Sequence, residues 1–319
     1  MTDNRVETTD KEWGFAFATS KGIRAPESMT TIVWRRFRRH PGAVAGSIVL
    51  GLLVLSVILV SFSPYDPEIS DLPSRLQSPS WQHLMGTDPL GRDLLTRCLY
   101  GGRISLTVGF LVVLITLVIG IPVGALSGYF GGWIDNVLMR ITDAALSLPA
   151  LLVLILLSAI LREMELPLFE RNNVVTIALV IGSLSWMTVA RLVRATFLTI
   201  REMDFVTAAH CVGAPNLRII VRHILPNAIG PVIVESTLEM GYAIMEEAGL
   251  SFLGFGIQPP TPSWGNLLSN AQEHITKHPW LAIFPGLMIF VAIISINYIG
   301  DGLRDAFDPH KVLKKVGEV

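Results

Sequence analysis

Long apolar runs without charge constrain this chain more than any other feature. About 20 such residues cross the hydrocarbon core of a membrane as a helix. Charge-free runs occupy residues 43–62, 104–134, 144–161, 172–190 and 278–300, and a sixth apolar stretch, 226–250, is interrupted by four glutamates. Only 16% of the residues are charged, whereas soluble domains carry about 25%. The sequence therefore predicts an all-α membrane protein with six transmembrane helices.

The distribution of Arg and Lys predicts the orientation of these spans. Six spans place both termini on one side, and fourteen basic residues near the spans then lie on that side, against seven on the other. Cytoplasmic loops carry the excess of basic residues. Both termini are therefore expected in the cytoplasm, together with the segment 201–227. The two cysteines, Cys98 and Cys211, fall on opposite sides, so no disulfide is expected between them.

Four segments follow from this topology. Residues 1–28 are polar and unpatterned and are expected to be a disordered cytoplasmic tail. Residues 29–103 hold an interfacial helix, the first span and a patterned outer segment, 104–303 hold spans two to six, and 304–319 form a cytoplasmic C-terminal tail. In residues 30–40, aromatics interleave with four arginines before a span. This pattern favours a helix at an anionic membrane surface over nucleic-acid binding.

The cytoplasmic segment 201–227 is patterned as two short helices broken at Gly213-Ala214-Pro215. Apolar residues recur at helical spacing on each side of the break. They are Phe205, Ala208, Ala209 and Val212 before it, and Leu217, Ile220, Val221 and Ile224 after it. A simple linker between spans needs no such double pattern, so we interpret the segment as a docking surface. The alternative is an ordinary amphipathic helix on the membrane.

The outer segment 83–97 is expected to form a structured lid over the outer mouth. Asp88-Pro89 and Gly91 predict a turn, and Asp93 is placed to cap the helix that follows. A metal or acid–base site is disfavoured because the His and Asp residues lack ligand spacing. His274 and His278 are four residues apart but have no third ligand nearby. No metal site is predicted.

Two patterns inside the spans suggest function. The second span carries glycines suited to close helix packing, Gly109, Gly120, Gly124 and Gly128. In the fifth span, Glu235, Glu239 and Glu246 lie within roughly 40° of one another on a helix, while Glu247 lies off that face. A carboxylate facing lipid is unfavourable. We interpret this acidic face as lining a translocation path for cationic substrates, or as pairing with basic residues of a partner.

Three motifs resemble those of one family of transport proteins. The first, after span one, contains Gly86, Thr87, Asp88, Gly91, Arg92 and Asp93. The second, in the cytoplasmic segment, contains Ala208, Ala209, Gly213, Ala214, Ile224, Leu225 and Pro226. The third, beyond span five, contains Glu247, Pro260, Trp264 and Gly265. Together they resemble a bacterial ABC-importer permease of the dipeptide/oligopeptide/nickel family, of the DppC/OppC type.

The resemblance implies a type I importer permease in the bacterial cytoplasmic (inner) membrane. The implied partners are a companion permease of the DppB/OppB type, two ATPase subunits, an extracytoplasmic binding protein and membrane lipid, with no nucleic acid. The second motif would dock in a groove of an ATPase subunit. Thr207 stands where that motif has its glutamate, which puts a salt bridge there in doubt. ATP and Mg²⁺ would belong to the partners, since the chain has no Gly-x-x-x-x-Gly-Lys-Ser/Thr phosphate loop. No enzymatic activity and no cofactor are expected in this chain.

Alternatives stay open at this point. Di- or oligopeptides are the expected cargo, but permeases of this family also carry nickel, glutathione or opines. A secondary transporter or channel could use the acidic face for proton coupling. That class is expected to show inverted repeats, which the sequence lacks, and it leaves the cytoplasmic segment without a role. A membrane hydrolase would need His or Cys companions for these carboxylates.

Overall fold

The computed structural model describes residues 29–164 and 174–308. The tail predicted for residues 1–28 and most of that predicted for 304–319 lie outside this part of the chain. The helices are α1 (Met29–Phe37), α2 (Pro41–Leu59), α3 (Leu94–Phe130), α4 (Gly132–Leu146), α5 (Ala150–Glu163), α6 (Val174–Arg201), α7 (Asp204–Cys211), α8 (Asn216–Arg218), α9 (Leu225–Phe252), α10 (Trp264–Ala271) and α11 (Trp280–Phe307). Short 3-10 turns occur at Val60–Phe62, Leu72–Ser74 and Gln272–His274, and Ile219–Ile224 is π-helical.

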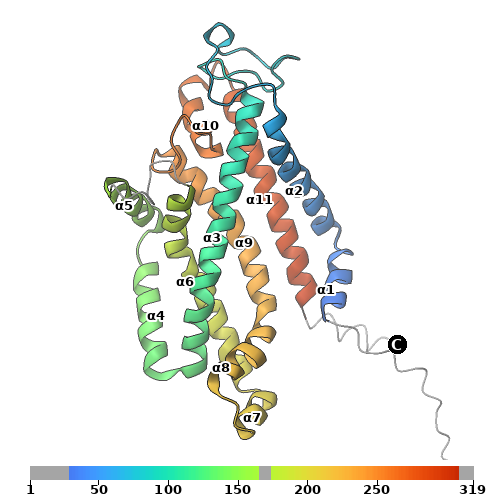
Figure 1. Ribbon diagram of the computed structural model, residues 1–319, viewed down its shortest axis with the longest axis vertical. Helices are drawn as coiled ribbons and strands as arrows, with labels where there is room; N and C mark the ends of the chain where they lie inside the picture. The colour runs from blue at the N-terminus through green and yellow to red at the C-terminus, as the bar shows by residue number, and fades with distance from the viewer. Residues whose placement is uncertain (1–28, 165–173, 309–319) are drawn as a thin grey trace, which may run out of the picture.

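The prediction of an all-α membrane protein is confirmed. Within the described ranges the only β pairing is one isolated bridge, between Thr87 and Asp93. Five helices are long and apolar enough to cross a membrane, or six if α4 and α5 together count as one span. These long helices run roughly alongside one another, with α10 and the segment before α3 at one end and α7 and α8 at the other (Figure 1).

The third span differs from the prediction. The charge-free run 144–161 predicts one continuous helix, but α4 and α5 meet at a 90° bend. Pro149 explains the break, because a proline disfavours helical geometry in the residue before it, here Leu148. Helix α3 continues through Phe130, and the chain turns only at Gly131, whose φ of 65° suits glycine.

Other span boundaries extend beyond the charge-free runs. Helix α3 begins ten residues before Ile104, because Asp93 caps it at Leu94. Helix α11 continues to Phe307 and takes several charged residues with it. The predicted segment boundaries at 103/104 and 303/304 therefore both fall inside helices. The outer segment thus shares a continuous helix with the spans of the core.

The closest helix packing is between α3 and α6, which pair more extensively than any other two elements. Glycines allow this approach, as predicted. A Cβ at Gly124 would lie 2.7 Å from the Val193 Cβ, and one at Gly128 would lie 2.6 Å from the Phe197 Cβ. Gly120 packs on α6 in the same way, and Gly109 packs on Ile244 of α9. Any larger side chain would separate these helices.

Candidate functional site

The cytoplasmic segment forms the end of the molecule that carries α7 and α8 (Figure 1). The predicted break is confirmed, since α7 ends at Cys211 and α8 begins at Asn216. Gly213 between them has a φ of 78°, and a Cβ there would meet nothing within 4 Å. The second helix is not short, however. Helix α8, the π-helical segment and α9 form one span from Asn216 to Phe252.

Each predicted apolar face of this segment contains both buried and exposed residues. On α7, Ala209 packs inward together with Val206, while Ala208 and Phe205 are exposed. Beyond the break, Ile224 is buried in the core. Within this segment the most exposed apolar residues are Val212, at 84%, and Leu217, at 72%. Their exposure leaves an apolar surface that no described part of the chain covers.

Tyr129, at the end of α3, contacts both α7 and α8 and holds these two helices in place. Its hydroxyl donates to Asn216 Oδ1 at 2.9 Å, and its ring stacks on that of His210 with centroids 6.4 Å apart. Arg201 Nη1 donates to the Tyr129 carbonyl at 3.1 Å. Sequence pattern alone does not single out Tyr129, because it lies in an apolar run of small and aromatic residues.

The remaining residues of the motif are spread over the same end. Thr207 and Gly213 are exposed, Ala214 is half-buried, and its amide donates to the Ala209 carbonyl at 3.1 Å. Leu225 and Pro226 open α9, where Pro226 occupies a first-turn position that needs no amide donor. The residues predicted to contact a partner therefore lie together. Among them Thr207, Ala208, Gly213 and Pro226 are exposed, and the others are buried or half-buried.

The acidic residues of α9 occupy two environments. Glu235 and Glu246 are half-buried, while Glu239 is only 6% exposed. Glu247 is fully buried on another side of the helix, as its angular position predicts. Its carboxylate accepts from Ser105 Oγ of α3 at 2.6 Å and from Ser251 Oγ at 2.7 Å.

The outer motif folds into a compact turn that its own side chains stabilise. Asp88 accepts from the backbone amides of Leu90 and Arg92, and from Arg92 Nε at 2.7 Å. Asp93 caps α3 by accepting from the Thr96 amide at 2.8 Å, which confirms its predicted role, and it also contacts His83 Nδ1 at 2.9 Å. These carboxylates are thus committed to the backbone and to neighbouring side chains.

Two glycines and a threonine complete this turn. Gly86 and Gly91 each have a φ of 78°, which favours glycine. A Cβ on Gly86 would lie 2.5 Å from the Gln77 carbonyl, and one on Gly91 would collide with the Asp71 carbonyl. The Thr87 hydroxyl accepts from the Gln77 amide at 2.8 Å. In the described ranges, no group of three His, Cys, Asp or Glu residues is arranged to hold a metal ion.

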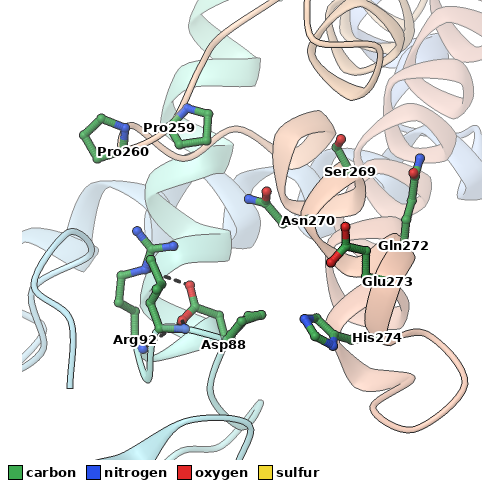
Figure 2. Close-up of a pocket in the computed structure, with 11 residues that line it drawn as sticks. Asp88, Arg92, Pro259, Pro260, Ser269, Asn270, Gln272, Glu273 and His274 are labelled. Carbon is green, nitrogen blue, oxygen red and sulfur yellow. Dashed lines mark hydrogen bonds and ion pairs between the residues drawn. The ribbon is translucent and has the colours of Figure 1, made fainter. Parts of the chain in front are cut away.

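A polar cavity of about 670 Å³ opens beside this turn. Asp88 and Arg92 form one wall, Pro259 and Pro260 lie above, and the residues at and after the end of α10, among them Glu273 and His274, form the opposite wall (Figure 2). The third motif shapes this region from beneath. Trp264 is buried, and its indole donates to the Cys98 carbonyl at 2.8 Å.

Gly265 completes the buried part of the third motif. A Cβ there would lie 2.7 Å from the Ala248 Cα of α9. The preceding residue, Ser263, caps α10 in a reciprocal pair with Asn266. Of the predicted outer residues, the structure therefore brings Asp88, Arg92 and Pro260 to the cavity, while Glu247, Trp264 and Gly265 lie in the interior.

Comparison with known proteins agrees with this architecture. Residues 120–312 match the family described as "Binding-protein-dependent transport system inner membrane component". Residues 28–79 match the "N-terminal TM domain of oligopeptide transport permease C".

Individual relatives are similar over most of their length. The chain is 41% identical to the dipeptide transport system permease protein DppC of Alkalihalophilus pseudofirmus, over 89% of this chain and 93% of that one. It is 38% identical to the glutathione transport system permease protein GsiD of Pectobacterium atrosepticum, over 86% and 89%. A solved chain of the MetNI methionine ABC transporter, in an inward-facing conformation, superposes with a TM-score of 0.52 at 19% identity. That superposition covers 65% of this chain and 94% of the solved one.

Proposed function

The chain belongs to the family of binding-protein-dependent inner-membrane transport components, as a multi-pass permease subunit of an ABC importer, and on that premise we propose that its cargo is di- or oligopeptides. The names of its relatives support a peptide, and glutathione is itself a tripeptide. Relatives of nearly equal identity nevertheless bear different substrate names, so the choice of cargo rests on chemistry in the path.

The observation that carries the proposal is the acidic face of α9. Glu235, Glu239 and Glu246 lie within a membrane span and would be unfavourable against lipid. We place this face along the path that the two permeases enclose. Carboxylates there favour a cationic group, and the free amino terminus is the cation that every unmodified peptide carries. Pairing with basic residues of the companion permease is the competing role.

A substitution in this face tests the cargo. Glu239→Gln keeps the shape of the side chain but removes its charge, so we expect lower uptake of peptides with a free amino terminus and little change for N-acetylated ones. Uptake is measured in vesicles that contain the assembled importer and its binding protein. Glu163→Gln, on the exposed end of α5, is the control. Equal uptake of both peptide classes by Glu239→Gln would exclude the substrate role.

The cytoplasmic end supports docking of one of the two ATPase subunits of the importer, and those subunits would bind ATP and Mg²⁺ themselves. The support is the exposed apolar surface around Val212 and Leu217, held rigidly by Tyr129. Because Thr207 replaces the glutamate of the motif, we propose that docking depends on shape more than on charge. The companion permease would lie against the acidic face, and the extracytoplasmic binding protein would dock over the outer cavity.

Gly213 provides the test of docking. A β-branched residue is strongly disfavoured at a φ of 78°, whereas asparagine tolerates it. We therefore expect Gly213→Val to uncouple ATP hydrolysis from transport, so that more ATP is hydrolysed per peptide imported, while Gly213→Asn stays close to wild type. Since no atom lies within 4 Å of the Cβ position, a defect in the valine variant reports on the turn and not on a clash. Full coupling in Gly213→Val would contradict this role.

A further inference from the structure

Helix α1 presents a concentrated positive charge at the cytoplasmic end of the molecule. Residues 29–40 contain four arginines and no acidic residue. Trp34 is 58% exposed, and the guanidinium of Arg38 lies over its ring at 5.2 Å. Arg38 and Arg39 are exposed, directly before α2 enters the membrane at Pro41. An exposed tryptophan among arginines is typical of a helix at the headgroup level.

This helix is fixed in place by the last span. Arg36 Nη1 donates to the carbonyls of Asp308, at 3.1 Å, and Ala306, at 3.4 Å, at the end of α11. The Phe37 ring packs over Gly302, whose Cβ position lies 3.4 Å from it. Figure 1 shows α1 beside this end of α11. Its charge is therefore held in one position relative to the spans.

An apolar groove of about 380 Å³ opens on the same helices. It lies between α2, α3, α9 and α11. Residues that line it include Leu50, Val113, Leu117, Ile233, Ile296 and Ile299. It is separate from the acidic face, because its lining residues on α9 lie on average more than 100° around that helix from Glu235 at 100° per residue.

The groove lies at the depth of the cytoplasmic leaflet. At 1.5 Å per residue, Leu50 is about 14 Å from the start of α2, and Ile299 is about 12 Å from the end of α11. Half of a hydrocarbon core is about 15 Å thick. Ile299 also precedes Gly302, on which α1 packs, by about one helical turn. The groove and the arginines at the end of α1 and in the turn after it are therefore neighbours along α11.

We propose that α1 and this groove form one binding site for an anionic phospholipid of the cytoplasmic leaflet. Its phosphate headgroup lies on Arg38 and Arg39, and one acyl chain fills the groove. The arginines beside the groove favour this occupant over a helix of the companion permease, because they complement the negative charge of a phosphate headgroup while the apolar lining complements an acyl chain.

Photolabelling of the assembled importer tests the site. One set of vesicles contains a trace of phosphatidylglycerol with a diazirine in its acyl chain, and a second set contains the matched phosphatidylcholine. After illumination the permease is digested, and mass spectrometry identifies which of its segments carry the label. We expect phosphatidylglycerol to label the groove segments of α3 and α9 roughly tenfold or more above the level of phosphatidylcholine. Each arginine near an anionic surface contributes about fivefold to binding. Arg38→Gln with Arg39→Gln should therefore reduce that preference roughly tenfold or more.

Matched controls separate the headgroup from the groove. Arg103→Gln removes an exposed arginine near the opposite end of α3 and should leave the lipid preference unchanged. Val113→Phe fills the groove and should abolish labelling there, while Val118→Phe, on an exposed part of α3 outside the groove, should not. Equal labelling by the two lipids in the wild type would overturn the proposal. So would crosslinking of a photoreactive residue at position 113 to the companion permease instead of lipid.

Discussion

Glu246 and Glu247 are adjacent in sequence, and the structure predicts opposite consequences for their substitution. Glu247 is fully buried and accepts from Ser105 of α3 and Ser251 of α9. In Glu247→Ala, two buried hydroxyls lose their acceptor, at about 1–3 kcal/mol each. Serines recover part of this by turning to a carbonyl of their own helix. The cavity left by the side chain adds about 1 kcal/mol, so we expect a loss of about 2–5 kcal/mol.

The assay is thermal denaturation of the purified assembly. The amount of protein that remains monodisperse is measured at each temperature. At about 2 °C per kcal/mol, Glu247→Ala should lower the midpoint by about 4–10 °C. Glu247→Gln keeps an acceptor oxygen and should lose much less. Glu246→Ala, on the acidic face, should stay within about 2 °C of wild type yet import fewer peptides with a free amino terminus. A wild-type midpoint for Glu247→Ala, or equal damage from alanine at both positions, would refute this assignment.

Three further outcomes are expected. Gly124→Ala should destabilise the protein by about 1–3 kcal/mol through overpacking against α6. Gly51→Ala, with open space around its Cβ, should be neutral or stabilising by up to about 1 kcal/mol. The thermal denaturation midpoints of the two variants in detergent compare these effects. Asp93→Ala should lose about 1–2 kcal/mol with the cap of α3, and Asp93→Asn should keep most of it; the same thermal assay applies. Tyr129→Phe removes the hydrogen bond to Asn216 and should raise the ATP hydrolysed per peptide imported, without lowering the expression level.

Features that depend on local sequence were predicted correctly. Charge-free runs located the spans, because a helix of about 20 apolar residues has the length that crosses the hydrocarbon core. The cap at Asp93 and the break at Gly213 depend on a side chain and a backbone geometry that a few residues determine. The glycines of α3 were also identified in advance, since residues four apart in a helix share one face.

Features that depend on the fold were missed or misjudged. The bend between α4 and α5 lies inside a charge-free run, and only Leu148-Pro149 signalled it. On α7, periodicity grouped Ala209 with Val212, but burial separates them because the rest of the protein covers only part of the helix. Tyr129 acquires its role from contacts with residues more than 80 positions away. Spacing along the chain cannot report such contacts.

Helix α3 connects the outer end of the molecule with the cytoplasmic docking segment, and an importer subunit must couple events at these two ends. It is 37 residues long, or about 55 Å at 1.5 Å per residue. Asp93 and the Cys98 carbonyl tie its outer end to the first and third motifs, and Tyr129 ties its inner end to the docking segment. Between them, α3 packs against α6 through glycines that receive Val189, Val193 and Phe197. A continuous helix tied at both ends can shift as one body, so we expect a change at the docking segment to displace the outer turn directly, without a relay through the acidic face.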